Sequence, residues 1–150
     1  MKSLSLAVLI AISTFGVNVS ANSDVDSFVS ELKSFDGKSG KVVMNGEERG
    51  NCTVLIENDS DAVRVEFDTP ELYANPVSVA VLDSAELLDN DTLLVSTNSN
   101  RPGGDACGDF GGASNYKEKI VIDDNSVSID ISYRCFLFKK NKINYTCKLN

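Results

Sequence analysis

Residues 98–116 form the segment whose residue types are best suited to binding a ligand. The segment contains five glycines and one cysteine among charged and aromatic residues, and Arg101-Pro102-Gly103 has the composition of a type II turn. Long connections without secondary structure usually have a function in a compact domain. We therefore predict a binding loop there, the alternative being a disulfide-held surface connection that binds nothing. The side chains that the loop would present are Arg101, Asp105, Asp109, Phe110 and Tyr116.

Catalytic chemistry is poorly represented in this sequence. There is no histidine, which excludes Ser-His-Asp and Cys-His arrangements. A pair of carboxylates could cleave a glycoside, but among 22 acidic residues such pairs arise by chance. The glycines do not form a phosphate-binding G-x-x-x-x-G-K-[ST] loop or a dinucleotide-binding strand-to-helix turn. We predict that the protein is not an enzyme and has no cofactor.

Metal ligands are also sparse. Oxygen-rich clusters at residues 58–61, 89–91 and 123–125 could contribute to a calcium site, but none has the spacing of an EF-hand loop. Two of the three are already expected to be hairpin turns. Zinc is disfavoured because there is no histidine and no C-x-x-C pair. No metal is predicted.

Residues 1–21 have the three parts of a signal peptide. Lys2 supplies a positive charge, residues 4–17 are mostly apolar, and Val19-Ser20-Ala21 has small residues where signal peptidase requires them. The apolar run is shorter than the roughly 20 residues of a membrane-spanning helix. We predict cleavage after this segment and export to the periplasm or the exterior, with residues 22–150 forming a single disulfide-stapled β domain that has no membrane span.

The mature domain would be strongly acidic. Without Lys2 it has 13 basic and 22 acidic residues, which is a formal net charge of −9. This charge disfavours nucleic acids and anionic membrane surfaces, whose phosphates it repels. It permits a cationic protein as partner, although a soluble surface without any partner would have the same composition.

The four cysteines of an exported domain predict two disulfides. An I-x-Y-x-C pattern occurs twice, ending at Cys135 and at Cys147, with a polar stretch over residues 139–142 between the two copies. A hairpin centred on Asn141 would place these cysteines opposite each other, at a separation that a disulfide can bridge. Two other connectivities stay open, including a bridge from the first cysteine to the C-terminal strands. The preferred pairs are Cys52–Cys107 and Cys135–Cys147.

An amphipathic helix is predicted over residues 24–35, ahead of the β-rich part of the chain. Its apolar residues recur at i, i+3, i+4 and i+7, which places them on one face. Asp36-Gly37 is expected to end it. The residues of the apolar face are Val25, Phe28, Val29 and Leu32.

Two β-hairpins are predicted after Lys41, with two-residue turns at Asp59-Ser60 and at Asp124-Asn125. These turns place the apolar residues of both strands on one face of each hairpin, whereas a slip of one residue would not. The expected opposite pairs are Ile56–Val63, Val54–Val65 and Cys52–Phe67 in the first hairpin, and Ile122–Val127 and Ile120–Ile129 in the second.

The middle of the chain contributes further strands. Alternating valines over residues 77–81 and the run over residues 92–97 indicate two of them, and Thr69-Pro70-Glu71 suggests the first turn of a very short helix. Residues 85–88 are compatible with a short strand or a helical turn. We predict a mostly β fold, a small antiparallel barrel or sandwich of about eight strands with the helix covering one end.

Three functions fit these expectations. The first is an exported binding or inhibitory β module, for example one that acts on a cationic enzyme. The second is a carrier of a small apolar ligand inside a barrel. The third is an envelope-associated structural or assembly protein that acts through strand pairing. The oligomeric state is not predicted.

Overall fold

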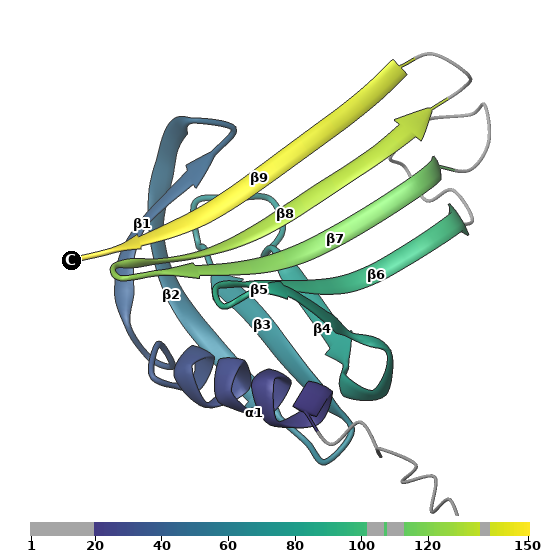
Figure 1. Cartoon of the computed structure of the whole chain (residues 1–150). Coiled ribbons are helices and arrows are strands. Elements are labelled where there is room, and N and C mark those ends of the chain that lie inside the picture. Colours follow the sequence, from purple (N-terminus) through teal and green to yellow (C-terminus); the bar gives the residue numbers. More distant parts are fainter. Residues whose placement is uncertain (1–19, 102–106, 108–112, 136–138) are drawn as a thin grey trace, which may run out of the picture.

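A computed structural model describes residues 20–101, 107, 113–135 and 139–150, and in this part of the chain nine antiparallel strands form one curled sheet with an α-helix against it (Figure 1). The fold is therefore mostly β, as predicted, with a curled half-barrel as its architecture. The elements are α1 (Ser20–Lys33), β1 (Ser39–Met44), β2 (Glu47–Asn58), β3 (Ala62–Asp68), β4 (Val77–Val81), a short 3-10 helix η1 (Leu82–Ser84), β5 (Glu86–Asp89), β6 (Thr92–Arg101), β7 (Ala113–Asp123), β8 (Ser126–Cys135) and β9 (Lys139–Leu149).

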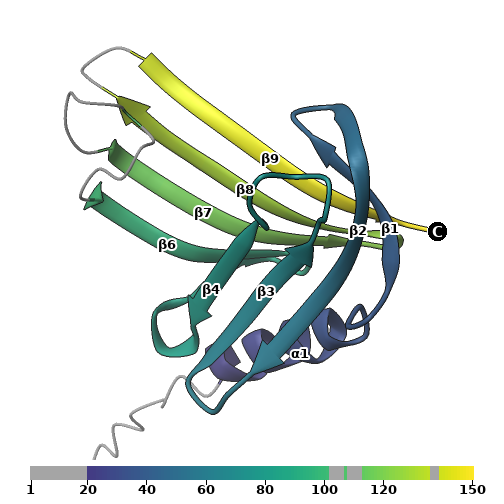
Figure 2. The same ribbon diagram turned by 180° about the vertical axis from the view of Figure 1, so that it is seen from behind.

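The sheet consists of two meanders that are joined through the first and last strands. Its strand order is β4-β3-β2-β1-β9-β8-β7-β6-β5, so β1 pairs with β9 and the two edges are β4 and β5. The curl of the sheet brings the inner face of β4 close to β6 without pairing the two strands. Figure 2 shows β4 at the free edge beside β3.

The helix α1 packs on the inner face of the sheet. Its predicted apolar face is buried, together with Phe35 just after the helix. The helix begins and ends earlier than predicted, and three successive turn hydrogen bonds follow it. Gly37 then adopts a positive φ of 72° and donates its N–H to the carbonyl of Val54 on β2. A residue without a Cβ suits this conformation, which directs the chain from the helix into the sheet.

The hairpin between β7 and β8 has the predicted register. Ile122 pairs with Val127 and Ile120 pairs with Ile129, and all four side chains are buried. In the hairpin between β2 and β3 the predicted face is correct but the pairs are wrong. Asp59 donates its N–H to the carbonyl of Ala62, so the turn is one residue later than predicted. Each strand residue consequently moves by two positions relative to its partner, which preserves the inward face. The observed pairs are Ile56–Val65 and Val54–Phe67.

The predicted hairpin centred on Asn141 is wrong. The polar residues 139–142 belong to β9, where Cys135 pairs with Lys139 and Cys147 pairs with Val127. This register places Ile131 opposite Ile143 and Ile129 opposite Tyr145, so apolar residues pair with apolar residues along the strands. The polar residues that suggested a turn lie instead on β9, where Lys140 and Lys142 are exposed and Asn141, on the other face, is half-buried.

The preferred disulfide connectivity is also wrong. The bonds are Cys52–Cys147 and Cys107–Cys135, so all four cysteines are oxidised as predicted but with different partners. In the observed register Cys135 pairs at one end of the β8–β9 ladder and Cys147 pairs near the other end, so the two cysteines lie far apart along their strands. Cys147 lies instead across β1 from Cys52, and this neighbourhood depends on the long-range pairing of β1 with β9.

The region before β4 contains turns where a short helix was predicted. Asn75 organises it, because its Oδ1 accepts hydrogen bonds from both the N–H and the hydroxyl of the buried Thr69. The strand β4 is present, but its valines point to solvent while Ser78 and Ala80 face the core. Small inward residues allow β4 to cross close to β6. Residues 85–88 were compatible with a short strand or a helical turn, and the structure has the strand β5 over Glu86–Asp89.

Candidate functional site

The predicted binding loop is only partly within the described residues. Asp105, Asp109 and Phe110 lie outside them, and the described part of Arg101 is its backbone at the end of β6. Tyr116 lies on β7, is only 7% exposed, and donates its hydroxyl hydrogen to Oε2 of Glu118 over 2.7 Å. Tyr116 therefore belongs to a small cluster near the Cys107–Cys135 disulfide and does not present a side chain to solvent.

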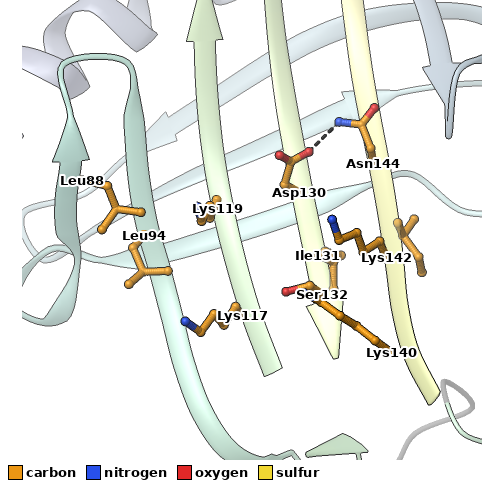
Figure 3. Close-up of a pocket in the computed structure, with 11 residues that line it drawn as sticks. Leu88, Leu94, Lys117, Lys119, Asp130, Ile131, Ser132, Lys140, Lys142 and Asn144 are labelled. Carbon is orange, nitrogen blue, oxygen red and sulfur yellow. Dashed lines mark hydrogen bonds between the residues drawn. The ribbon is translucent and has the colours of Figure 1, made fainter. Parts of the chain in front are cut away.

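A different set of side chains gathers on the other face of the same strands. On β7 the residues alternate, so Glu118 and Ile120 are buried while Lys117 and Lys119 project from the face opposite the core. The alternation on β9 does the same for Lys140 and Lys142. These four residues, which we call the lysine face, line one pocket of about 470 Å³ (Figure 3).

The strand register arranges the lysine face around β8. Lys117 pairs with Ser132, which in turn pairs with Lys142, so a serine separates two lysines in one row. In the adjacent row Asp130 lies between Lys119 and Asn144. With neighbouring strands about 4.8 Å apart, the lysines of β7 and β9 have their backbones about 10 Å apart.

Between the lysines the pocket is lined by Ile131 and Ile143 and by polar groups that are held in place by hydrogen bonds. The side-chain amide of Asn144 donates to Oδ1 of Asp130, as Figure 3 shows, and its own oxygen accepts from the Thr146 hydroxyl over 3.1 Å. The backbone of Asn144 also exchanges two hydrogen bonds of 2.9 Å with Asn45, which adopts a positive φ of 51°. These contacts orient the polar groups before any ligand arrives.

The pocket has an apolar margin on one side and continues into a second pocket on the other. Leu88 and Leu94 line it beside β7, and Leu88 is 45% exposed. In the other direction a second pocket of about 350 Å³ shares Lys117, Ser132 and Lys140 with the first and continues toward Arg134. The two pockets together make an open, elongated site along the strands.

The electrostatics of this site are opposite to those of the whole chain, whose formal net charge is −8. Within the part of the chain that the structure describes, none of the four lysines has an ion-pair partner. Asp130 is the one carboxylate among the described residues that line the larger pocket. Two lysines about 7 Å apart along a strand repel each other by roughly 0.6 kcal/mol in water, so a bound anion would relieve this repulsion.

Our sequence reasoning did not find the lysine face, although a local signal exists. Lys117-Glu118-Lys119 and Lys140-Asn141-Lys142 both have lysines two residues apart, which is the spacing that places side chains on one face of a strand. The second of these triplets was interpreted as a turn, and the overall acidity directed attention to cationic partners.

The acidic clusters that were considered for calcium serve as turns. The N–H of Asp91 bonds to the Asp89 carboxylate over 3.1 Å, and that of Asp124 bonds to Asp123 over 2.8 Å. Among the described residues, no group of three or more histidine, cysteine, aspartate or glutamate side chains is arranged to hold a metal ion.

Comparison with known proteins leaves the site to be interpreted from its own chemistry. No protein-family model matches the chain, and no curated protein is significantly similar to it. Across the described ranges, no helix has both the length and the apolar character needed to cross a membrane.

Proposed function

We propose that this protein is an exported binding module that takes an anionic ligand on the lysine face. The observation that carries the proposal is that four ammonium groups without ion-pair partners, within the described residues, line one open pocket. In an otherwise acidic chain, such a concentration of positive charge is not needed for solubility.

The local positive charge can act despite the negative charge of the chain. At physiological ionic strength, charges further apart than about 8 Å are largely screened from each other. An anion in the pocket therefore interacts mainly with the lysines that surround it. The acidic remainder of the surface affects mainly the rate of approach, which predicts faster association as moderate salt is added before binding weakens at high salt.

The disulfides support a location for this function outside the cytoplasm. Two disulfides indicate an oxidising extracellular or periplasmic environment. Together with the signal peptide predicted over residues 1–21, this supports a role outside the cytoplasm. The inhibition of a cationic enzyme remains a prediction that the lysine face does not support.

The carrier alternative receives less support from the packing. Phe28 and Leu32 of α1 are fully buried against the inner face of the sheet, where an apolar ligand would have to bind. Such a ligand would need to displace the helix and lose the hydrophobic contacts that hold it.

The test is calorimetric titration at low salt with two anionic probes, tripolyphosphate and oligogalacturonate. We expect the double variant Lys117→Gln/Lys142→Gln to bind both probes roughly tenfold more weakly, because each exposed charge contributes a fraction of a kcal/mol to about 1 kcal/mol. Replacing Lys33 and Lys38 with glutamine changes the net charge equally but away from the site, and should leave affinity almost unchanged. Absence of binding to both probes, or equal weakening in the two double variants, would refute the proposal.

A further inference from the structure

We infer that the anionic ligand is an acidic saccharide, whose charged groups bind the lysines and whose hydroxyl groups bind the polar residues between them. This inference rests on the proposed function and specifies the class of ligand. It is carried by Asp130, a carboxylate placed between Lys119 and Asn144 in the centre of an otherwise cationic pocket.

A carboxylate in this position is unfavourable for a simple anion. Phosphate oxygens that approached all the lysines would also approach Asp130 and be repelled by it. An ionised carboxylate accepts hydrogen bonds only, with about four lone-pair sites, and Asn144 uses one of them. The remaining sites are suited to hydroxyl donors, which a saccharide supplies on every ring, whereas a short inorganic phosphate chain at neutral pH carries at most a P–OH group at its ends.

Ser132 on β8 and Asn144 on β9 provide further groups that can form hydrogen bonds with saccharide hydroxyl groups. The Ser132 hydroxyl can donate and accept, and it lies in the row between Lys117 and Lys142. The hydrogen bonds of Asn144 to Asp130 and Thr146 fix which of its atoms are available. Polar groups therefore lie between the lysines of β7 and the lysines of β9, whose backbones are about 10 Å apart across β8. This arrangement suits a ligand that carries separate charges on a hydroxyl-rich framework.

The shape of the site favours an extended ligand over a compact one. The two adjoining pockets share Lys117, Ser132 and Lys140 and continue along the strands, so among the described residues they offer an elongated path to a linear chain. Leu88 and Leu94 offer an apolar margin to the C–H faces of sugar rings. The lining also includes Ile131 and Ile143, so the apolar part of the larger pocket consists of four side chains.

The substitution Asp130→Asn separates the two kinds of ligand by the sign of its effect. It removes the negative charge and keeps the size of the side chain. Tripolyphosphate should then bind about threefold more tightly, because a repulsion of about 0.7 kcal/mol is lost. Oligogalacturonate should bind roughly tenfold more weakly, because a charge-assisted hydrogen bond to a hydroxyl group is lost.

The controls make the outcomes distinguishable. Far-UV circular dichroism and urea unfolding establish that each variant is folded, and the uncharged maltohexaose should bind neither the natural protein nor the variants detectably. Tighter binding of both anions by the Asp130→Asn variant would overturn the saccharide inference while leaving anion binding intact. Stronger binding of vesicles rich in phosphatidylglycerol than of oligogalacturonate would also overturn it. Failure of both soluble anions to bind would remove the proposed function itself.

Discussion

Cys52 on β2 and Cys147 on β9 are joined by a disulfide across β1, the strand that lies between them. Two strands that flank a third are normally about 10 Å apart, yet the Cα atoms of these cysteines are separated by 5.9 Å. The sheet must therefore bend sharply at β1. Gly40 pairs with Cys52 on one side and with Leu149 on the other, which places it at the bend.

Replacing Gly40 with alanine should destabilise the fold. A Cβ at this position would lie 1.9 Å from the carbonyl oxygen of Lys148 and 2.8 Å from Cα of Leu149, and both are backbone atoms that cannot rotate away. We expect a loss of about 2–3 kcal/mol or more in the free energy of unfolding, measured in urea. Ser39→Ala on the same strand serves as the control and should cost less than about 1 kcal/mol. An unchanged stability for the Gly40→Ala variant would contradict the bend.

The two disulfides should contribute unequally to stability. Cys52–Cys147 closes a separation of 95 residues within the main core, whereas Cys107–Cys135 closes 28 residues. The entropy model for chain closure gives the longer link an advantage of about 1 kcal/mol. We therefore expect Cys52→Ala/Cys147→Ala to lower the urea midpoint more than Cys107→Ala/Cys135→Ala does, and the reverse order would show that core placement and loop length do not decide the effect.

Acid should remove part of the stability through Glu66. Hydrogen bonds from Arg64 over 2.6 Å and from Asn75 over 2.8 Å favour the ionised carboxylate and lower the pKa of Glu66. A lowered pKa in the folded state contributes stability above the unfolded value of about 4.3, and this contribution is lost as the pH falls through the folded value. Glu66→Gln should therefore lose less stability than the natural protein between pH 5 and pH 3. Because the Arg64 side chain is 43% exposed and solvent weakens its ion pair with Glu66, the difference should stay below about 1 kcal/mol, as urea titrations at each pH would measure.

The exposed edge strand β4 should promote association at high concentration. Val79 is 49% exposed on an edge that pairs only with β3 among the described strands, and unpaired edges without charges are prone to pair with other chains. Val79→Lys should slow aggregation during heating, followed by light scattering, and change the free energy of unfolding by no more than about 0.5 kcal/mol.

The matched control for Val79→Lys is Leu55→Lys. Leu55 is 40% exposed on β2, a strand paired on both sides, so this variant also replaces an exposed apolar side chain with a charge. If both variants slow aggregation equally, surface hydrophobicity or net charge is the cause and edge pairing is not.

Local patterns in the sequence were sufficient for several elements. The 3.6-residue period identified the buried face of α1, and the two-residue period with its Asp124-Asn125 turn identified the β7–β8 hairpin with the correct pairs. In the β2–β3 hairpin the period identified the inward face but not the pairs, because a shift of two residues leaves every side chain on the same face. The mostly β class and the oxidation of all four cysteines followed from composition and periodicity.

The disulfide partners and the lysine face were decided only by tertiary structure. Which cysteine reaches Cys147 depends on β1 inserting between β2 and β9, a pairing between the two ends of the described chain. Likewise, Lys117 and Lys142 become parts of one site because β8 lies between their strands in one particular register. Periodicity records which way a side chain points relative to its own strand. It carries no information about which strands become neighbours, since that choice depends on packing energies summed over the whole sheet.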